Sequence, residues 1–137
     1  MTIQIPSDRP IMLVEDDPIG RLIFAKVVER SALANSLIAF ESGEEAIDYL
    51  RQRSERDASM PCVVFLDVNM PGMGGFEVLE QIKSGGLHAK PPTVIMLTSS
   101  DAAEDREDAT RLGADLFLTK QAVVADFVRA IESAICN

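Results

Sequence analysis

Polar side chains that could form a ligand site follow four separate apolar runs of this sequence. They are acids, a hydroxyl and a lysine: Glu15, Asp16, Asp17, Asp67, Thr98 and Lys120. If each run is a strand of one parallel sheet, the carboxyl ends of the strands meet at one edge, and these side chains converge there. Ligands of open α/β sheets bind in the crevice beyond that edge. The pattern therefore predicts a charged ligand site.

Each of these residues also has a simpler explanation. Asp17 can cap a helix, because Pro18 follows it at a favoured first helical position. Asp67 can form a turn, Thr98 can be an ordinary β-branched strand residue, and Lys120 can extend along the surface. Their joint occurrence at the ends of four runs favours a common site.

The elements that would position these residues alternate regularly along the chain. Five apolar runs are separated by segments of helical periodicity, which is typical of a mostly parallel sheet with helices on both faces. Three runs are continuously apolar, as expected for strands covered on both faces. The predicted strands are 11–15, 36–40, 62–67, 93–98 and 115–120.

The first two helices have clear start signals. The first begins after Asp17 with Pro18, and its predicted apolar face consists of Ile19, Leu22, Ile23 and Val27. The second begins with a capping box, Ser42 and Glu45, and is predicted to run to about Arg53.

The last three helices have weaker boundaries. The third follows the Gly-rich turn 71–75, and a turn-rich loop spans 84–92. Asp101 could cap the fourth, which is predicted to end at Gly113. The apolar positions of the fifth are Val124, Phe127, Val128, Ile131 and Ile135.

Size and composition limit the classes of protein. With 137 residues the chain is predicted to be one domain, residues 10–137, after an N-terminal tail, residues 1–9. A net charge of -9 argues against nucleic-acid binding, for which a basic surface is required. No apolar run approaches the roughly 20 residues of a membrane span, and no signal peptide is visible, so we expect a cytoplasmic protein without a membrane partner.

Four motifs in order resemble those of the bacterial response-regulator receiver domain, the CheY-like module of two-component signalling. They are LVEDDP, FLDVNMPGMGGFEVL, MLTSS and FLTK, and the resemblance covers about residues 10–135. It implies an α/β fold, CheY-like or flavodoxin-like: a doubly wound, five-stranded parallel sheet of order 2-1-3-4-5 with helices on both faces. The segment DVNMP looks like receivers that accompany phytochrome-type kinases.

The resemblance also implies the chemistry. Asp67 would take a phosphoryl group from a phosphohistidine of a sensor histidine kinase. Glu15, Asp16, Asp67 and the main-chain carbonyl of Asn69 would hold Mg²⁺ through oxygen ligands. Because the reference pKa of Asp is about 3.9, we expect Asp67 to be a carboxylate at neutral pH.

The same resemblance implies a switch. Lys120 and the Thr98 hydroxyl would hold the phosphoryl oxygens. Thr98 and Phe117 would then move together and alter a surface read by an unknown output protein. Phe117 can equally be a plain core aromatic. We expect the protein to catalyse only its own phosphorylation and dephosphorylation and not to be an enzyme that acts on other substrates.

Two positions depart from the family pattern and leave alternatives open. Gln121 stands where Pro is usual, so either a trans Lys120–Gln121 bond with a shifted loop or a strained cis bond is expected. Ser99 stands where the family usually has a smaller residue, Ala or Gly. A degenerate receiver that only binds partners, a phosphorelay intermediate serving a histidine phosphotransfer protein, and a weak homodimer remain open. A phosphatase is disfavoured, since Asn69 occupies the place of its second acid.

Overall fold

The structure is a computed structural model that describes residues 8–31, 33, 35–54, 56–99, 103–127 and 129. Strands and helices alternate along it. The strands are β1 (Ile11–Val14), β2 (Leu37–Phe40), β3 (Val63–Asp67), β4 (Thr93–Thr98) and β5 (Leu116–Thr119). The helices are α1 (Pro18–Arg30), α2 (Gly43–Arg51), α3 (Gly75–Ser84), α4 (Ala103–Arg111) and α5 (Lys120–Ala125).

The five strands form one parallel sheet of order β2-β1-β3-β4-β5. The predicted strand order is therefore confirmed, and every predicted strand lies within one residue of its observed bounds. In the register, Val14 at the end of β1 pairs with Phe40 and with Leu66. All residues of β1 and β3 are buried, which explains why these segments are apolar without alternation.

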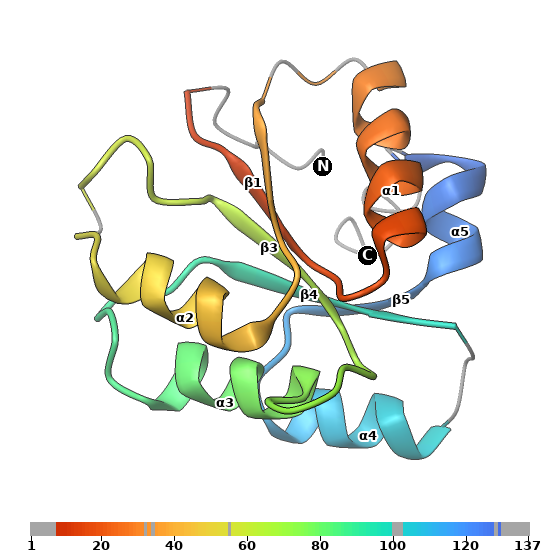
Figure 1. Cartoon of the computed structure of the whole chain (residues 1–137). Helices are drawn as coiled ribbons and strands as arrows, with labels where there is room; N and C mark the ends of the chain where they lie inside the picture. The colour runs from red at the N-terminus through yellow and green to blue at the C-terminus, as the bar shows by residue number, and fades with distance from the viewer. Residues whose placement is uncertain are drawn as a thin grey trace.

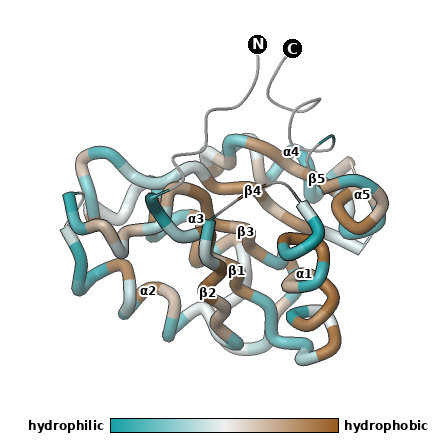
Figure 2. The backbone as a smooth tube through the Cα atoms, turned by 90° about the horizontal axis from the view of Figure 1, so that it is seen from above, coloured by the Kyte–Doolittle hydropathy of each residue, from teal (hydrophilic) through white to brown (hydrophobic). Residues whose placement is uncertain are grey.

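Helices cover both faces of the sheet. Figure 1 shows α1 and α5 on one face, with α2, α3 and α4 on the other. Successive residues of β3 alternate between the two core clusters, so Phe65 packs on the α1 side and Leu66 on the α2 side. The central strands are largely brown, the hydrophobic end of the scale, in Figure 2.

Helix α1 begins as predicted but buries a different stripe. The Asp17 side chain accepts a hydrogen bond from the Ile19 amide at 3.1 Å, and Pro18 is the first helical residue. Phe24 and Val28 are the buried residues, and Phe24 packs on Phe65 with ring centroids 4.9 Å apart. The predicted apolar face is therefore wrong for three of its four residues, because Ile19 (65%), Leu22 (60%) and Ile23 (44%) are exposed. The fourth, Val27, is partly buried and packs against the core. Two apolar stripes lie side by side on this helix, and the one that contains Phe24 and Val28 packs against the sheet.

The predicted capping box of α2 is confirmed. The Glu45 amide donates to Ser42 Oγ at 3.2 Å, and that hydroxyl donates to the Glu45 carboxylate at 3.1 Å. The helix ends at Arg51, two residues earlier than predicted.

The last two helices are less deeply anchored. Ala109 is the buried residue of α4, and Gly113 follows this helix with φ of 95°, the left-handed conformation expected just past a helix end. In the α5 region Val123 and Phe127 are buried, whereas Val124 is 53% exposed, contrary to its predicted core position. The predicted cap Asp101 and the predicted core residues Val128, Ile131 and Ile135 lie outside the described residues. Within the described part of the chain, no helix is long and apolar enough to cross a membrane.

Candidate functional site

The loop between β1 and α1 carries the first two acids. Glu15 follows the last residue of β1 and is only 4% exposed, while Asp16 is the next residue along the loop. The loop turns directly into α1 because Asp17 caps that helix. The Asp17 amide also donates to Glu15 Oε2 at 3.4 Å, so the cap and the buried carboxylate belong to one turn.

Asp67 is the last residue of β3 and is 4% exposed. Its position depends on a close approach by the start of α3. A side-chain carbon on Gly75 would overlap the carbonyl oxygen of Asp67 and would lie 2.9 Å from Cα of Val68. Gly75 therefore lets α3 begin directly against the backbone of Asp67. The Asn69 amide donates to Asp67 Oδ1 at 3.3 Å.

Lys120 brings a cation to both carboxylates. Its Nζ lies 2.6 Å from Glu15 Oε1 and 3.5 Å from Asp67 Oδ1. No peptide bond in the described residues is cis, so the Lys120–Gln121 bond is trans. Helix α5 starts at Lys120 itself, capped by the Thr119 hydroxyl. The replacement of the usual Pro therefore leaves the lysine in contact with the acids.

The pKa values of the two buried carboxyls move in opposite directions. Burial, then the hydrogen bond to Glu15 and its negative charge, raise the pKa of Asp67 to about 7. Burial opposes ionisation of Glu15 as well, but hydrogen bonds from Asp67 and Lys120 outweigh it and lower its pKa. The expectation that Asp67 is fully ionised at neutral pH is thus wrong for the protein without metal. The lysine pKa is raised, because attraction to both acids exceeds the cost of burial.

The acidic cluster fits a divalent cation. One carboxylate oxygen from each of Glu15, Asp16 and Asp67 lies within 4.8 Å of the other two. Three carboxylates form a hard, oxygen-only donor set, which suits Mg²⁺ or Mn²⁺ better than zinc. Lys120 alone leaves the cluster with excess negative charge, which a divalent cation would neutralise.

Thr98 and Phe117 lie on the adjacent strands. Thr98 is the last residue of β4, 1% exposed, and pairs with Thr119 of β5. Phe117 pairs with Met96, two residues before Thr98, so both residues share the sheet face covered by α2, α3 and α4. The guanidinium of Arg106 lies 4.9 Å from the centre of the Phe117 ring.

Two further residues, Gly20 and Arg21, shape this site and were not predicted from the sequence. A side-chain carbon on Gly20 would lie 2.9 Å from Glu15 Oε1, so a larger residue there would displace the Glu15 carboxylate from its observed position. An isolated Gly inside a helical pattern was the available signal. Arg21 contacts the backbone of the acidic loop, and nothing in the pattern distinguished it from an ordinary surface arginine.

This fold, with an acidic cluster and a lysine at the carboxyl ends of its strands, matches a known family. The family model described as response regulator receiver domain matches residues 11–132. The chain therefore belongs to the response-regulator receiver family, whose members act in two-component signalling.

Three relatives place it more narrowly within that family. The solved structure of the bacteriophytochrome response regulator AtBRR is 35% identical with a TM-score of 0.74, covering 90% of this chain and 89% of that one. The phosphorylated cyanobacterial phytochrome response regulator RcpA is 28% identical with a TM-score of 0.73, covering 91% and 89%. Response regulator Rcp1 of Synechocystis sp. is 30% identical over 89% of this chain and 83% of its own length. Rcp1 has also been solved in a Mn²⁺-bound form.

Proposed function

We propose that Asp67 is the phosphoacceptor of a two-component response regulator. The observation that carries this proposal is the contact of a buried strand-end carboxylate with Lys120, beside two further acids. Burying several carboxylates together costs free energy, because they lose their hydration. Such clusters are therefore found mainly at functional sites.

The chemistry follows from these positions. An oxygen of ionised Asp67 attacks the phosphorus of a phosphohistidine, the O–P bond forms as the P–N bond breaks, and the imidazole leaves with the electron pair. Lys120 lies where it can neutralise charge on the transferring group. Glu15, Asp16 and Asp67 would hold Mg²⁺, which when bound supplies the positive charge that these acids lack.

A nucleophilic Asp67 must lose its proton first. With its pKa at about 7, the metal-free carboxyl is about half protonated at neutral pH. Cation binding and ionisation are therefore coupled, since a carboxylate ligand must be deprotonated.

The readout of phosphorylation would pass through the neighbouring strands. Thr98 and Phe117 share one sheet face, and Arg106 links the Phe117 ring to α4. Movement of the Thr98 hydroxyl toward a phosphoryl group would be transmitted to Phe117 and to α4, where an output protein can read it.

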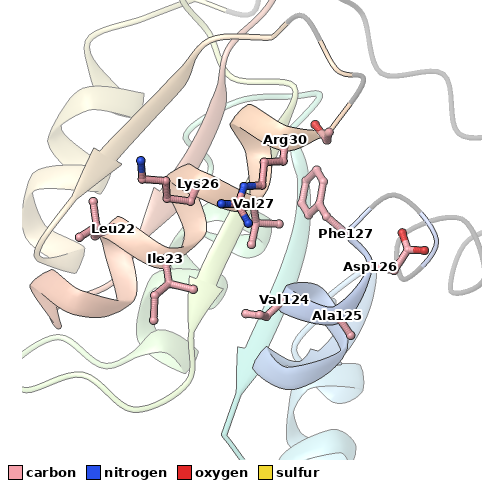
Figure 3. Close-up of a pocket in the computed structure, with 10 residues that line it drawn as sticks. Leu22, Ile23, Lys26, Val27, Arg30, Val124, Ala125, Asp126 and Phe127 are labelled. Atoms are coloured by element: carbon pink, nitrogen blue, oxygen red, sulfur yellow. The ribbon is translucent and has the colours of Figure 1, made fainter.

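The phosphodonor would be a protein that docks beside the site. Exposed apolar residues of α1 and α5 lie next to the site, because Ile23 and Val124 line the same small cavity as Glu15 and Lys120. The adjoining groove has a volume of about 750 Å³. Figure 3 shows Ile23 and Val27 of α1 among the residues that line it. From the named relatives we infer a histidine kinase of the phytochrome type as the donor. A degenerate receiver is not favoured, because Lys120 keeps its contacts despite Gln121.

Intact-mass measurement tests the phosphoacceptor directly. The protein is incubated with acetyl phosphate and Mg²⁺, and one added phosphoryl group is expected. The adduct should disappear in Asp67→Asn and when EDTA replaces Mg²⁺, and it should be reduced in Lys120→Ala. An adduct that persists in Asp67→Asn would contradict the assignment. No adduct in any form, and none from a phosphorylated kinase, would favour a partner-binding role alone.

A further inference from the structure

Arg21 of α1 reaches back to the loop that carries the acidic pair. Its Nη1 donates to the carbonyl oxygen of Glu15 at 2.8 Å and to that of Asp16 at 3.0 Å. The side chain is 24% exposed, so these bonds are partly shielded from water. One guanidinium nitrogen thus joins the main chain of two consecutive acids.

These two bonds act on the orientation of the acidic side chains. The carbonyl directions fix the peptide planes that flank Asp16, and these planes determine where the Glu15 and Asp16 carboxylates point. Both carboxylates belong to the cluster whose oxygens lie within 4.8 Å of one another. Like charges at this separation repel, so the loop must be held against spreading.

The other contact of Arg21 is weaker. Its Nη2 lies 3.8 Å from Glu41 Oε2, and the Glu41 side chain is 68% exposed. Exposed ion pairs of this kind contribute little to stability. The two carbonyl contacts are therefore the main interactions of Arg21. The other arginine of α1, Arg30, is exposed at the end of the helix.

We propose that Arg21 is a positioning residue for the cation site. It holds the main chain of Glu15 and Asp16 so that their carboxylates and that of Asp67 are presented together to Mg²⁺. This inference rests on the proposed function of the acidic cluster. Groups that orient metal ligands commonly change metal affinity 10- to 100-fold when removed.

The test measures cation binding without phosphorylation. Mn²⁺ is titrated into the protein and free Mn²⁺ is followed by electron paramagnetic resonance. Arg21→Met, which removes the donors and keeps much of the stem, should weaken Mn²⁺ binding by about 10-fold or more. Arg21→Lys, which keeps a cationic donor, should restore part of the affinity. Glu41→Gln and Arg30→Met are the matched controls and should stay within about 2-fold of wild type.

A second readout separates positioning from general damage. The phosphorylation rate of Arg21→Met is measured against Mg²⁺ concentration. The half-saturating Mg²⁺ concentration should rise by the same factor as the Mn²⁺ dissociation constant, while the rate at saturating Mg²⁺ should approach that of wild type. A lower rate at saturation with unchanged Mg²⁺ dependence would overturn the proposal.

Other results of these experiments would also support or overturn the positioning role of Arg21. Wild-type Mn²⁺ affinity in folded Arg21→Met overturns the positioning role and leaves the phosphoacceptor proposal intact. If circular dichroism shows that Arg21→Met is unfolded, Arg21→Gln is judged by the same criterion. An Arg30→Met effect equal to that of Arg21→Met would show that only net charge matters, which also overturns the inference. A wild-type protein that binds no Mn²⁺ refutes the metal site itself.

Discussion

Replacing Asp67 by Asn should make the protein more stable at alkaline pH. In the metal-free protein the folded state must ionise a carboxyl that is 4% exposed and lies beside Glu15. The unfolded chain ionises the same carboxyl freely. An amide avoids this cost and can still donate a hydrogen bond to Glu15.

The magnitude follows from the raised pKa. The shift from 3.8 to about 7 spans about three pKa units, and each unit corresponds to about 1.4 kcal/mol. Below pH 3.8 the carboxyl is neutral in both states, so it costs nothing. As the pH rises toward 7 only the unfolded state releases its proton, and folding stability falls progressively. Above pH 7 the full cost of about 4 kcal/mol applies, and it is an upper bound because Glu15 shares the proton.

Urea unfolding followed by circular dichroism measures this effect. Wild type and Asp67→Asn are compared in EDTA at pH 5 and pH 8. We expect Asp67→Asn to be more stable at pH 8 by about 2–4 kcal/mol, with a smaller advantage at pH 5. Added Mg²⁺ should reduce the difference, because it stabilises the ionised wild-type cluster.

An advantage that does not change between pH 5 and pH 8 would refute this reasoning, since it could not arise from the ionisation of Asp67. Asp48→Asn is the control for net charge. Asp48 has the same chemistry on the exposed face of α2, 3.8 Å from Arg51. Its replacement should change stability by less than about 1 kcal/mol at either pH.

Further expectations follow from the same structure. Mg²⁺ affinity measured by calorimetry should rise with pH up to about pH 7 and then level off, because the cation must displace the proton of Asp67; a flat profile would contradict the raised pKa. Gly75→Ala should lower the free energy of unfolding by about 1–3 kcal/mol and reduce phosphorylation, because the added carbon overlaps the Asp67 carbonyl oxygen. The matched control is Gly74→Ala, where the nearest atom would lie 3.9 Å away. Phe24→Ala should cost about 3–5 kcal/mol in chemical unfolding, whereas Leu22→Ala, on the exposed stripe of α1, should be nearly neutral; equal costs would contradict the observed helix orientation.

The sheet was predictable because its strands carry a strong and simple pattern. Buried parallel strands need continuous apolar runs, and β1 and β3 have them. Because parallel strands end at one edge, the positions of Glu15, Asp67 and Lys120 in the sequence were enough to predict their convergence.

The orientation of α1 was not predictable, because two apolar stripes compete on it. Ile19, Leu22 and Ile23 have the right spacing, but the ring of Phe24 fills the space against Phe65. Only the tertiary fit selects between such stripes. The same holds for the pKa of Asp67, which depends on burial and on the distance to Glu15, quantities that the sequence does not encode locally.

The helices differ in how many residues they bury, so one side of the molecule should be easier to deform than the other. Helices α2 and α3 each bury four residues, while the described part of α4 buries Ala109 alone. A helix that buries so little apolar surface opens at low free energy, so its amides should exchange with deuterium before those of α2 and α3. The central strands that end in the acidic cluster then act as a rigid frame. The region beside β5 can be remodelled at small energetic cost, so we expect a modest change of charge at the strand ends to be enough to alter its shape.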